Sequence, residues 1–337
     1  MIFNSFIMKT ILIVGFGSIG KRHFKNILNN YKMKIVICTK RKDLGKLIGK
    51  NILVVDSISK ALIHKPNMAL ISNETSFHVK TAIRLAKAEL DLFIEKPLSS
   101  SSNGVKELEK IVNENHLVSL VGCDHRFHPC LKKIKEILDK KKLGRIFSVQ
   151  VESSSLLPDW HPYEDYRKGY SAKKELGGGI ATTMTHELDF LRWFFGDIKE
   201  IFSITKKVSD LDITVDDISS MNMIFENSII GEVHLDFFAR PQFKSCKIRG
   251  AKGTLYWNTD SNDVKIFYNN QKKWKMIFKP KKFERNQMFV KELDYFLKCV
   301  KNKDKTFNDI TEGGKTLKVI LGAKKSSQFK KMIKVRY

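Results

Sequence analysis

The sequence predicts an α/β protein with two parts, a doubly wound parallel sheet followed by an α+β region that holds a large open, mostly antiparallel sheet. Two observations carry this prediction. Short apolar runs alternate with helix-like segments through residue 123, which is the rhythm of βαβ units. After about Leu143, short runs of alternating polarity follow one another with few long helices between them, which is typical of an antiparallel sheet.

In the first part, short apolar runs are the expected strands. They are Ile11–Val14, Lys34–Cys38, Ile52–Val55, Met68–Ile71, Asp91–Ile94 and Val118–Gly122. Helices are expected between them, for example over Phe77–Ala88 and Ser102–Glu114. Because right-handed crossovers bring the carboxyl ends of parallel strands to one edge, we expect the ligand site at that edge.

In the second part, the expected strands are Gly144–Glu152, Glu200–Lys207, Ser219–Phe225, Ser228–Phe238, Lys244–Ile248, Gly253–Asn258 and Asp263–Phe267. Helices are expected over Ile180–Phe195, Asn286–Val300 and Thr311–Lys330. The lysine-rich segment Lys132–Lys142 has apolar residues at helical spacing, so its lysines are interpreted as a solvated helix face. We therefore expect one domain over residues 1–123 and another over 124–337, whose C-terminal helices can pack back on the first.

The 337 residues carry a formal net charge of +25, with lysines spread over the whole chain. We therefore expect no nucleic-acid partner, although the charge is compatible with phosphorylated substrates. No apolar run reaches the roughly 18 residues that span a bilayer, so no membrane partner is expected. The first eight residues lack a basic n-region, and the five cysteines are scattered without CxxC spacing. These features favour a cytoplasmic protein with free thiols and no metal site.

The most specific motif is Gly15-x-Gly17-x-x-Gly20, which follows Ile11–Val14 and opens a helix-like segment. Gly15 allows the tight turn, Gly17 lets the backbone approach a pyrophosphate, and Gly20 lets the helix pack on the strand. The diphosphate would lie at the helix N-terminus, where free N–H groups favour anions. The motif predicts a Rossmann-type dinucleotide-binding domain, and the alternative is a glycine-rich turn in another α/β protein. The predicted contacts in this loop are Gly15, Phe16, Gly17, Ser18, Ile19 and Gly20.

The second expected strand leads into Ile37–Asp43, where NAD-binding proteins place an acid that binds the ribose 2′-hydroxyl. Here Thr39, Lys40 and Arg41 occupy these positions, and no acid comes before Asp43. Because cations suit a 2′-phosphate, the sequence favours NADP(H) over NAD(H). The alternative is that Lys40 and Arg41 are surface cations of a basic protein.

Two side chains have the chemistry of proton transfer. Lys96 lies in Phe93–Ser99, at the carboxyl end of the fifth expected strand, where an amine can hydrogen-bond a substrate hydroxyl. His186 lies near the start of the helix that follows Gly177–Gly179, with Asp189 on nearly the same face. The alternatives are a surface lysine at a strand end and a structural histidine.

The segment Pro158–Arg167, PDWHPYEDYR, is rich in side chains that bind sugars. Ring faces and hydrogen-bonding groups come from Trp160, His161, Tyr163 and Arg167. We expect a substrate-binding loop here, and the alternatives are a surface flap or an oligomer contact.

Together these motifs resemble the Gfo/Idh/MocA family of NAD(P)-dependent oxidoreductases over nearly the whole chain. The matching pieces are GFGSIG, Ser72–Ala82, EKP, Val121–Pro129, the GGG…H helix and Glu312–Ser327. The resemblance implies that Lys96 and His186 flank the substrate carbon and the nicotinamide. It also implies a homodimer or homotetramer that pairs through the open sheet. The further cofactor contacts that it implies are Ser72, Asn73, His78, Glu95, Lys96 and Arg126.

One position departs from the family pattern. Many members carry an aspartate three or four residues before the helix histidine, where this chain has Thr183 and Thr182. A threonine can hydrogen-bond a sugar hydroxyl, so both are expected to bind substrate, but it cannot act as an anion beside a protonated imidazole. Either Lys96 and His186 suffice for proton transfer, or a carboxylate enters from elsewhere in the chain.

The expected reaction is hydride transfer to or from a hydroxyl or carbonyl carbon of a sugar or sugar derivative, with or without a phosphate or nucleotide. Pro158–Arg167 with the following SAKKELGGG is similar to a subgroup associated with bacterial surface-sugar gene clusters, including nonulosonate-type sugars. One alternative is a redox-neutral epimerase or glycosidase that keeps its cofactor and turns over without net change in NAD(P)H. Another is a non-catalytic NAD(P)-sensing protein, which the missing aspartate favours and the retained Lys96 and His186 disfavour. Nucleic-acid binding is the least favoured.

Overall fold

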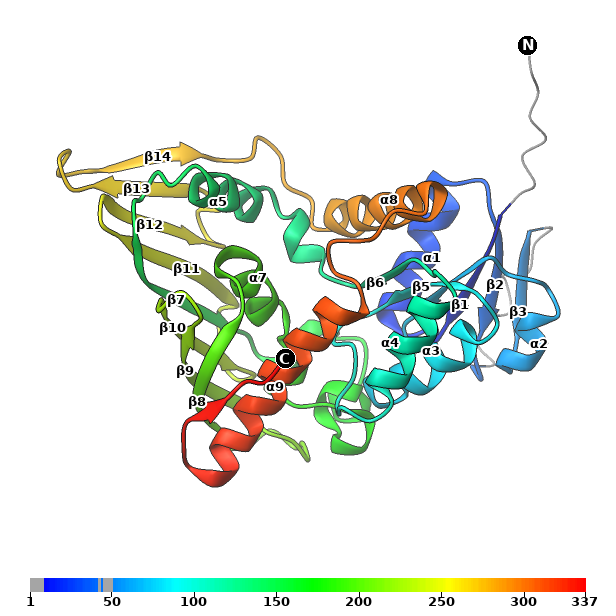
Figure 1. Ribbon diagram of the computed structural model, residues 1–337. Coiled ribbons are helices and arrows are strands. Elements are labelled where there is room, and N and C mark those ends of the chain that lie inside the picture. The colour runs from blue at the N-terminus through cyan, green and yellow to red at the C-terminus, as the bar shows by residue number, and fades with distance from the viewer. Residues whose placement is uncertain (1–8, 42–43, 45–50) are drawn as a thin grey trace, which may run out of the picture. The chain divides into compact units, whose positions relative to one another are not determined.

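The structure is a computed structural model that describes residues 9–41, 44 and 51–337 (Figure 1). The expectations for residues 1–8 and for Asp43 lie outside these described residues. The chain divides into two compact units. The first comprises residues up to Gly122 together with Phe289–Gly314, and the second comprises Cys123–Met288 together with Lys315–Tyr337. Residues 289–314, which the sequence analysis grouped with the second domain, thus belong to the first unit.

The first unit is built on a six-stranded sheet in the order β3-β2-β1-β4-β5-β6. Its strands are β1 (Thr10–Val14), β2 (Lys34–Cys38), β3 (Ile52–Val55), β4 (Met68–Ile71), β5 (Asp91–Ile94) and β6 (Ser119–Val121). Each strand pairs with its neighbours in parallel. The strand order reverses between β1 and β4, which is the point where doubly wound sheets bind ligands.

Helices cover both faces of this sheet. They are α1 (Ser18–Asn30), α2 (Ile58–Leu62), α3 (His78–Ala86), α4 (Val105–Glu114) and the part of α8 (Asn286–Asn302) from Phe289 onward. Successive residues of β1 alternate between the faces, because Ile11 and Ile13 join a core cluster with α1 and α8 while Leu12 and Val14 join one with α2, α3 and α4. A sheet buried on both faces explains why its strands are near-continuous apolar runs.

The second unit holds a nine-stranded sheet in the order β14-β13-β12-β11-β7-β10-β9-β8-β15. Its strands are β7 (Ile146–Ser154), β8 (Ile198–Lys206), β9 (Ile218–Phe225), β10 (Ile230–Asp236), β11 (Phe243–Gly250), β12 (Gly253–Asn258), β13 (Val264–Tyr268), β14 (Trp274–Phe278) and β15 (Ile333–Lys334). Neighbours pair antiparallel except β7 with β10, which are parallel. The predicted fold class, a parallel doubly wound sheet and a mostly antiparallel open sheet, is confirmed.

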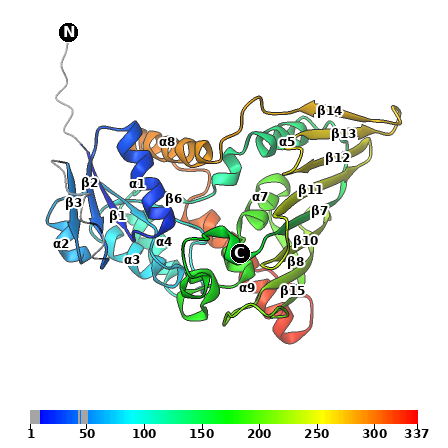
Figure 2. The same cartoon turned by 180° about the vertical axis from the view of Figure 1, so that it is seen from behind.

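Helices pack on one face of the nine-stranded sheet (Figure 2). These are α5 (Pro129–Asp139), α6 (Ile180–Thr183), α7 (His186–Phe195) and the part of α9 (Ile310–Phe329) from Lys315 onward. Leu131, Ile134 and Ile137 of α5 are buried in this core, which confirms the predicted solvated face on its other side. Along β10 the side chains alternate between buried and partly or fully exposed, as a sheet with one solvated face requires.

The structure differs from the expectation at one helix and two strands. The helix expected over Ile180–Phe195 is two helices, because Met184 leaves the helical region and the Thr185 hydroxyl donates to the Thr182 carbonyl at 2.7 Å. Such side-chain bonds to the backbone compete with the helical pattern. Strands β14 and β15 were not predicted, since β14 is largely exposed and β15 has only two residues. Among the described helices, none is both long and apolar enough to cross a membrane.

Candidate active site

The glycine loop follows β1 and has the geometry of a dinucleotide cradle. Gly15 has a φ of +89°, and a Cβ atom there would lie 2.5 Å from the Asn73 amide nitrogen. A Cβ atom on Gly20 would lie 2.4 Å from the Gly15 carbonyl oxygen, whereas one on Gly17 would meet nothing within 4 Å. Gly15 and Gly20 are therefore required by packing, and Gly17 leaves open the space that a pyrophosphate would occupy.

The N-terminus of α1 is left open for an anion. Gly17 is the N-cap, no described side chain caps the helix, and its first turn contains no acidic residue. The free N–H groups of that turn are the donors that phosphates use. Ser18 and Ile19 are partly exposed, while Phe16 is buried against Phe24 at 5.5 Å between ring centroids and holds the loop to the helix.

The loop after β4 contacts the glycine loop directly. The Ser72 hydroxyl donates to the Gly15 carbonyl at 3.1 Å, and the Asn73 side-chain amide donates to Thr81 Oγ1 at 3.1 Å. Asn73 Oδ1 is buried without a hydrogen-bond partner among the described residues. Buried acceptors rarely lack a donor, so this oxygen fits a donor on a bound ligand.

His78 connects this loop with the loop after β5. Its Nδ1 lies 2.9 Å from the Pro97 carbonyl oxygen, and its Nε2 lies 2.9 Å from the Asn73 carbonyl oxygen. Burial lowers the pKa of His78, while the hydrogen bonds to the two carbonyls act in the opposite direction. The ring thus holds both loops, and His78 was predicted as a cofactor contact.

The Glu95–Lys96 pair directly follows β5. Glu95 is buried, and its Oε1 lies 2.6 Å from Nε2 of His23 in α1. Burial alone would raise the pKa of Glu95, but the hydrogen bond and charge of His23 outweigh it and lower this pKa. Glu95 Oε2 also accepts from the Lys96 amide at 3.3 Å, so the carboxylate fixes the start of the loop that carries the partly exposed Lys96.

The end of β2 presents the predicted ribose-binding positions. The Thr39 amide donates to the Val55 carbonyl at 2.9 Å, and its hydroxyl accepts from the Arg41 amide at 3.2 Å. Lys40 and Arg41 are exposed. The turn is thus held by Thr39, and two cations stand at its surface.

In the second unit, His186 lies beside a carboxylate that the sequence analysis did not identify. His186 is the first residue of α7, and its Nε2 lies 3.3 Å from Asp124 Oδ1. The His186 side chain is 15% exposed and that of Asp124 is 4% exposed. The ring of His125 packs edge-on against that of His186, with 4.1 Å between centroids. Burial, and then the charge of His186, lower the pKa of His125 well below its usual value, so His125 is neutral.

Asp189, expected on the face of His186, binds Arg126 instead. Two guanidinium nitrogens of Arg126 donate to the two carboxylate oxygens of Asp189, each at 2.9 Å. Both residues are buried, and the guanidinium also lies over the Trp193 ring at 5.9 Å. Arg126, predicted as a cofactor contact, is thus held in a bidentate pair within its own unit.

The two threonines that replace the family aspartate are buried. The Thr182 hydroxyl donates to the carbonyls of Gly178 and Gly179 at 2.9 and 3.0 Å. Its proton is therefore used in hydrogen bonds to the backbone at the start of α6. Gly179 has a φ of +113°, and the next amide, that of Ile180, donates to Asp216 Oδ2 at 2.9 Å. The carboxylate that enters from elsewhere to face His186 is therefore Asp124 rather than a residue of this turn.

The predicted substrate loop has an anchored and an exposed part. The Trp160 indole N–H donates to Ser155 Oγ at 2.7 Å, and the ring packs on Phe237. Tyr163 is 74% exposed, with its hydroxyl 3.2 Å from His161 Nδ1. Arg167 is exposed and forms a bidentate pair with Asp165.

Two models of one family match the chain. The description "Oxidoreductase family, NAD-binding Rossmann fold" covers residues 9–123, and "GFO/IDH/MocA C-terminal domain" covers residues 131–256. The chain belongs to the Gfo/Idh/MocA oxidoreductase family. This confirms the predicted resemblance, and it confirms a nicotinamide dinucleotide as the cofactor class.

Individual relatives extend the likeness over nearly the full chain. Myo-inositol 2-dehydrogenase of Thermotoga maritima is 24% identical over 96% of this chain and 97% of its own length. Among solved structures, levoglucosan dehydrogenase in complex with NADH superposes with a TM-score of 0.87, at 16% identity and covering 97% of this chain and 99% of that one. The WlbA dehydrogenase from Bordetella pertussis in complex with NADH and UDP-GlcNAcA superposes with a TM-score of 0.82. It is 20% identical, and the match covers 98% of this chain and 99% of that one. The predicted enzyme class, a dehydrogenase acting on CH–OH groups, is confirmed at the level of the family and these relatives.

Proposed function

We propose that this protein is an NAD(P)-dependent dehydrogenase or reductase of a sugar or sugar derivative, acting in bacterial surface-glycan metabolism. The observation that carries the proposal is the position of His186, 3.3 Å from the buried carboxylate of Asp124, in a chain that keeps the dinucleotide cradle. A partly exposed imidazole beside a buried carboxylate is suited to proton transfer, which dinucleotide sensing does not need. The pair therefore favours an enzyme over the sensing alternative.

The cofactor fits the residues of the first unit. Gly15, Gly17 and Gly20 with the open N-terminus of α1 would hold its diphosphate, and Asn73 Oδ1 offers a buried acceptor. When bound, a nicotinamide dinucleotide supplies or accepts the hydride. We propose a preference for NADP(H), because Lys40 and Arg41 are exposed cations at the ribose position and suit a 2′-phosphate.

His186 is the proposed proton carrier. During oxidation the substrate carbon loses a hydride and its hydroxyl loses a proton, which the His186 imidazole accepts and returns in the reverse direction. The Asp124 carboxylate stabilises the imidazolium that forms, and neutral His125 adds no opposing charge. Lys96 is the second proposed catalytic residue, and its amine polarises the substrate oxygen. In the alternative, Lys96 accepts the proton and His186 polarises the oxygen.

The substrate class follows from the relatives and from the loop after β7. The relatives act on or bind inositol, levoglucosan and a nucleotide-linked sugar acid, as their names and titles state. We propose a sugar of this kind, with or without a phosphate or nucleotide. Three side chains near the anchored Trp160 are exposed or partly exposed, namely His161, Tyr163 and Arg167. We propose that these three side chains and Thr183 contact the sugar. A bound nucleotide sugar in a similar fold supports the surface-glycan role.

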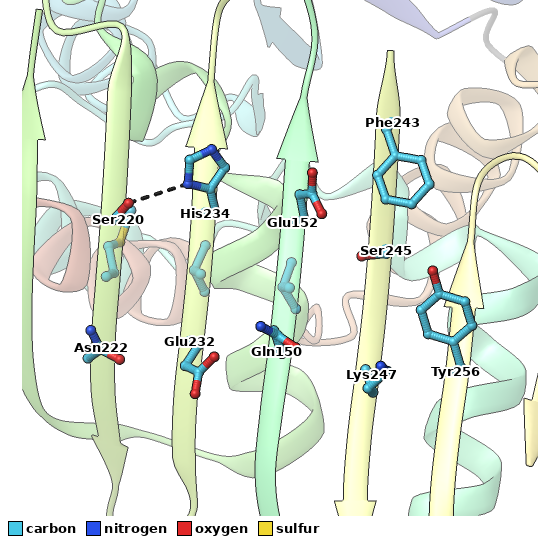
Figure 3. A pocket seen from close by; sticks show the side chains of 13 residues that line it. Gln150, Glu152, Ser220, Asn222, Glu232, His234, Phe243, Ser245, Lys247 and Tyr256 are labelled. Carbon is cyan, nitrogen blue, oxygen red and sulfur yellow. Dashed lines mark hydrogen bonds between the residues drawn. The ribbon is translucent and has the colours of Figure 1, made fainter. Parts of the chain in front are cut away.

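We further propose a cytoplasmic homodimer or homotetramer that pairs through the solvated face of the nine-stranded sheet. This face carries Glu152, His234 and Tyr256, and the His234 ring lies 3.3 Å from the Ser220 hydroxyl (Figure 3). Ile230 and Trp274 on strands of the same sheet are more than two-fifths exposed. Such apolar side chains on a sheet face favour a partner sheet. Light scattering that shows only monomers in solution would contradict the proposed homodimer or homotetramer.

The test of the function is a substrate panel. The purified chain is mixed with oxidised or reduced NAD or NADP and with free, phosphorylated and nucleotide-linked sugars, while the nicotinamide absorbance is followed. We expect at least one sugar to change the absorbance at a rate that depends on His186. Product formation without any absorbance change would instead show the redox-neutral alternative.

A further inference from the structure

The Asp124–His186 pair has a third neighbour with metal-binding chemistry. One ligand atom from each of Asp124, His125 and His186 lies within 4.8 Å of the other two. His186 Nε2 is 3.3 Å and His125 Nδ1 is 3.8 Å from the same oxygen, Asp124 Oδ1. Two segments distant in sequence, the turn Asp124–Phe127 and the start of α7, thus bring three donor atoms close together.

The two separations from Asp124 Oδ1, 3.3 and 3.8 Å, are close to those of a tetrahedral zinc site. Zinc–nitrogen and zinc–oxygen distances of about 2.0–2.2 Å place neighbouring ligand atoms roughly 3.3–3.6 Å apart in a tetrahedron. Two imidazoles and one carboxylate are a ligand set that zinc uses in proteins, and three protein ligands leave a fourth position for water or substrate. Mg²⁺ and Ca²⁺ require more oxygen ligands than this cluster offers.

A second observation points to a ligand at the same place. The His125 side chain is 11% exposed, and its Nδ1 is buried without a hydrogen-bond partner among the described residues. Buried polar atoms nearly always have a partner, so this nitrogen is an exception that a bound cation would explain. The positive charges of Lys244 and Arg285 act on His125, and Lys244 is itself paired with the Glu187 carboxylate at 2.7 Å.

We propose that Asp124, His125 and His186 bind one divalent transition-metal ion, for which Zn²⁺ is the preferred species. The metal ion would occupy the position of the proton on His186 and therefore block proton transfer. The binding itself depends only on the three side chains, whereas the inhibition rests on the proposed function. The prediction of no metal site rested on the scattered cysteines without CxxC spacing, which do not report on histidine and aspartate ligands.

The experiment is a calorimetric titration of the metal-free full chain with Zn²⁺, without cofactor or sugar. His125→Phe keeps a ring against His186 but removes the ligand nitrogen, and Asp124→Asn keeps the side-chain shape but removes the charge. His234→Gln is the matched control, because His234 Nε2 lies 3.1 Å from Asp236 Oδ2 on the sheet face, outside the cluster. Thermal unfolding in the presence of a chelator verifies that each variant is folded.

We expect one Zn²⁺ to bind per chain in the wild type. The Zn²⁺ affinity should be at least about tenfold weaker in His125→Phe and Asp124→Asn, and unchanged in His234→Gln. Mg²⁺ should not bind. Equal Zn²⁺ affinity in the wild type and the two folded cluster variants would overturn the proposal, as would a loss confined to His234→Gln. If neither cluster variant folds, anomalous scattering from a zinc-soaked wild-type crystal decides, since the peak must lie among the three ligand atoms. Activity measurements distinguish the metal site from the proposed function. If zinc binds at this cluster but does not slow hydride transfer, the metal site is supported and the proposed role of His186 is contradicted.

Discussion

The protein holds a buried histidine–carboxylate pair in each of its two units, and the two pairs differ in access. His23 and Glu95 in the first unit are 2.6 Å apart, with side chains 0 and 9% exposed. His186 and Asp124 in the second unit are 3.3 Å apart, and the His186 side chain is 15% exposed at the start of a helix. The first pair connects α1 to the end of β5, whereas the second leaves the imidazole of His186 partly exposed. A histidine beside a carboxylate is thus enclosed in the first unit and partly open in the second, where we propose that it transfers a proton.

The largest expected effect separates the two pairs by function. His186→Ala should lower turnover by about 10² or more, because the proton carrier is lost. Dinucleotide affinity should stay nearly unchanged, since the cradle lies in the other unit. Steady-state kinetics and a fluorescence titration with the reduced cofactor measure the two quantities, and a normal turnover number would refute the role of His186.

The next effect concerns stability. His23→Phe keeps the ring contacts with Phe93 and Phe289 but leaves the Glu95 carboxylate buried without its partner, which should cost about 3–5 kcal/mol of unfolding free energy. Urea unfolding measures it. A variant as stable as the wild type would show that the first pair is not a structural one.

The same pair predicts a pH dependence. The pKa of Glu95 is lowered in the folded state, so its pair contributes stability above the unfolded value of about 4.3, and this is lost as the pH falls through the folded value. The unfolding free energy of the wild type should therefore decrease below about pH 4.3. In His23→Phe this part of the decrease should disappear, and an identical slope in both proteins would contradict the assignment.

Most of the fold could be predicted from the sequence, because its signals are local. The apolar runs that became β1 to β6 and the alternating runs that became β7 to β13 each carry their own periodicity. The break between α6 and α7 could not be predicted, because it depends on how the hydroxyl of Thr185 bonds the backbone. Strand β14 could not be predicted either, since an exposed edge with Trp274 and Met276 outward has no alternating burial.

The site was only half predictable for a different reason. Gly15, Lys96 and His186 belong to motifs that a short stretch of sequence contains. Asp124 and His23 act through partners far along the chain, so no local pattern shows which carboxylate meets which imidazole. Asp189 illustrates the difficulty, because helical spacing placed it on the face of His186 while its carboxylate binds Arg126.

A smaller effect tests the cofactor preference. Replacing both Lys40 and Arg41 by Ala should raise the KM for NADP⁺ roughly tenfold, because charge-assisted hydrogen bonds to a 2′-phosphate are lost. The KM for NAD⁺ should change little, which makes it the internal control. Equal changes with both cofactors, or a wild type that favours NAD⁺, would contradict the proposed preference.

The smallest effect concerns a third pair, His234 with Asp236, which is the most exposed of the three. Hydrogen bonding to Asp236 raises the pKa of His234, so the pair stabilises the fold below the unfolded value of about 6.5 and loses this as the pH rises through the folded value. Solvent screening limits the contribution to under about 1 kcal/mol. In an NMR titration, the midpoint of the His234 ring should be higher in the wild type than in an Asp236→Asn variant. Equal midpoints would show that Asp236 does not stabilise the charged form of His234.

The most direct test of the account is the pH profile of single-turnover sugar oxidation in the wild type and in Asp124→Asn. If His186 accepts the proton with Asp124 stabilising its charged form, the rate rises with pH as the imidazole deprotonates. In Asp124→Asn the rise should then move to lower pH, together with a slower rate. An unchanged profile, with the same rate in both proteins, would contradict the claim that this pair carries the proton.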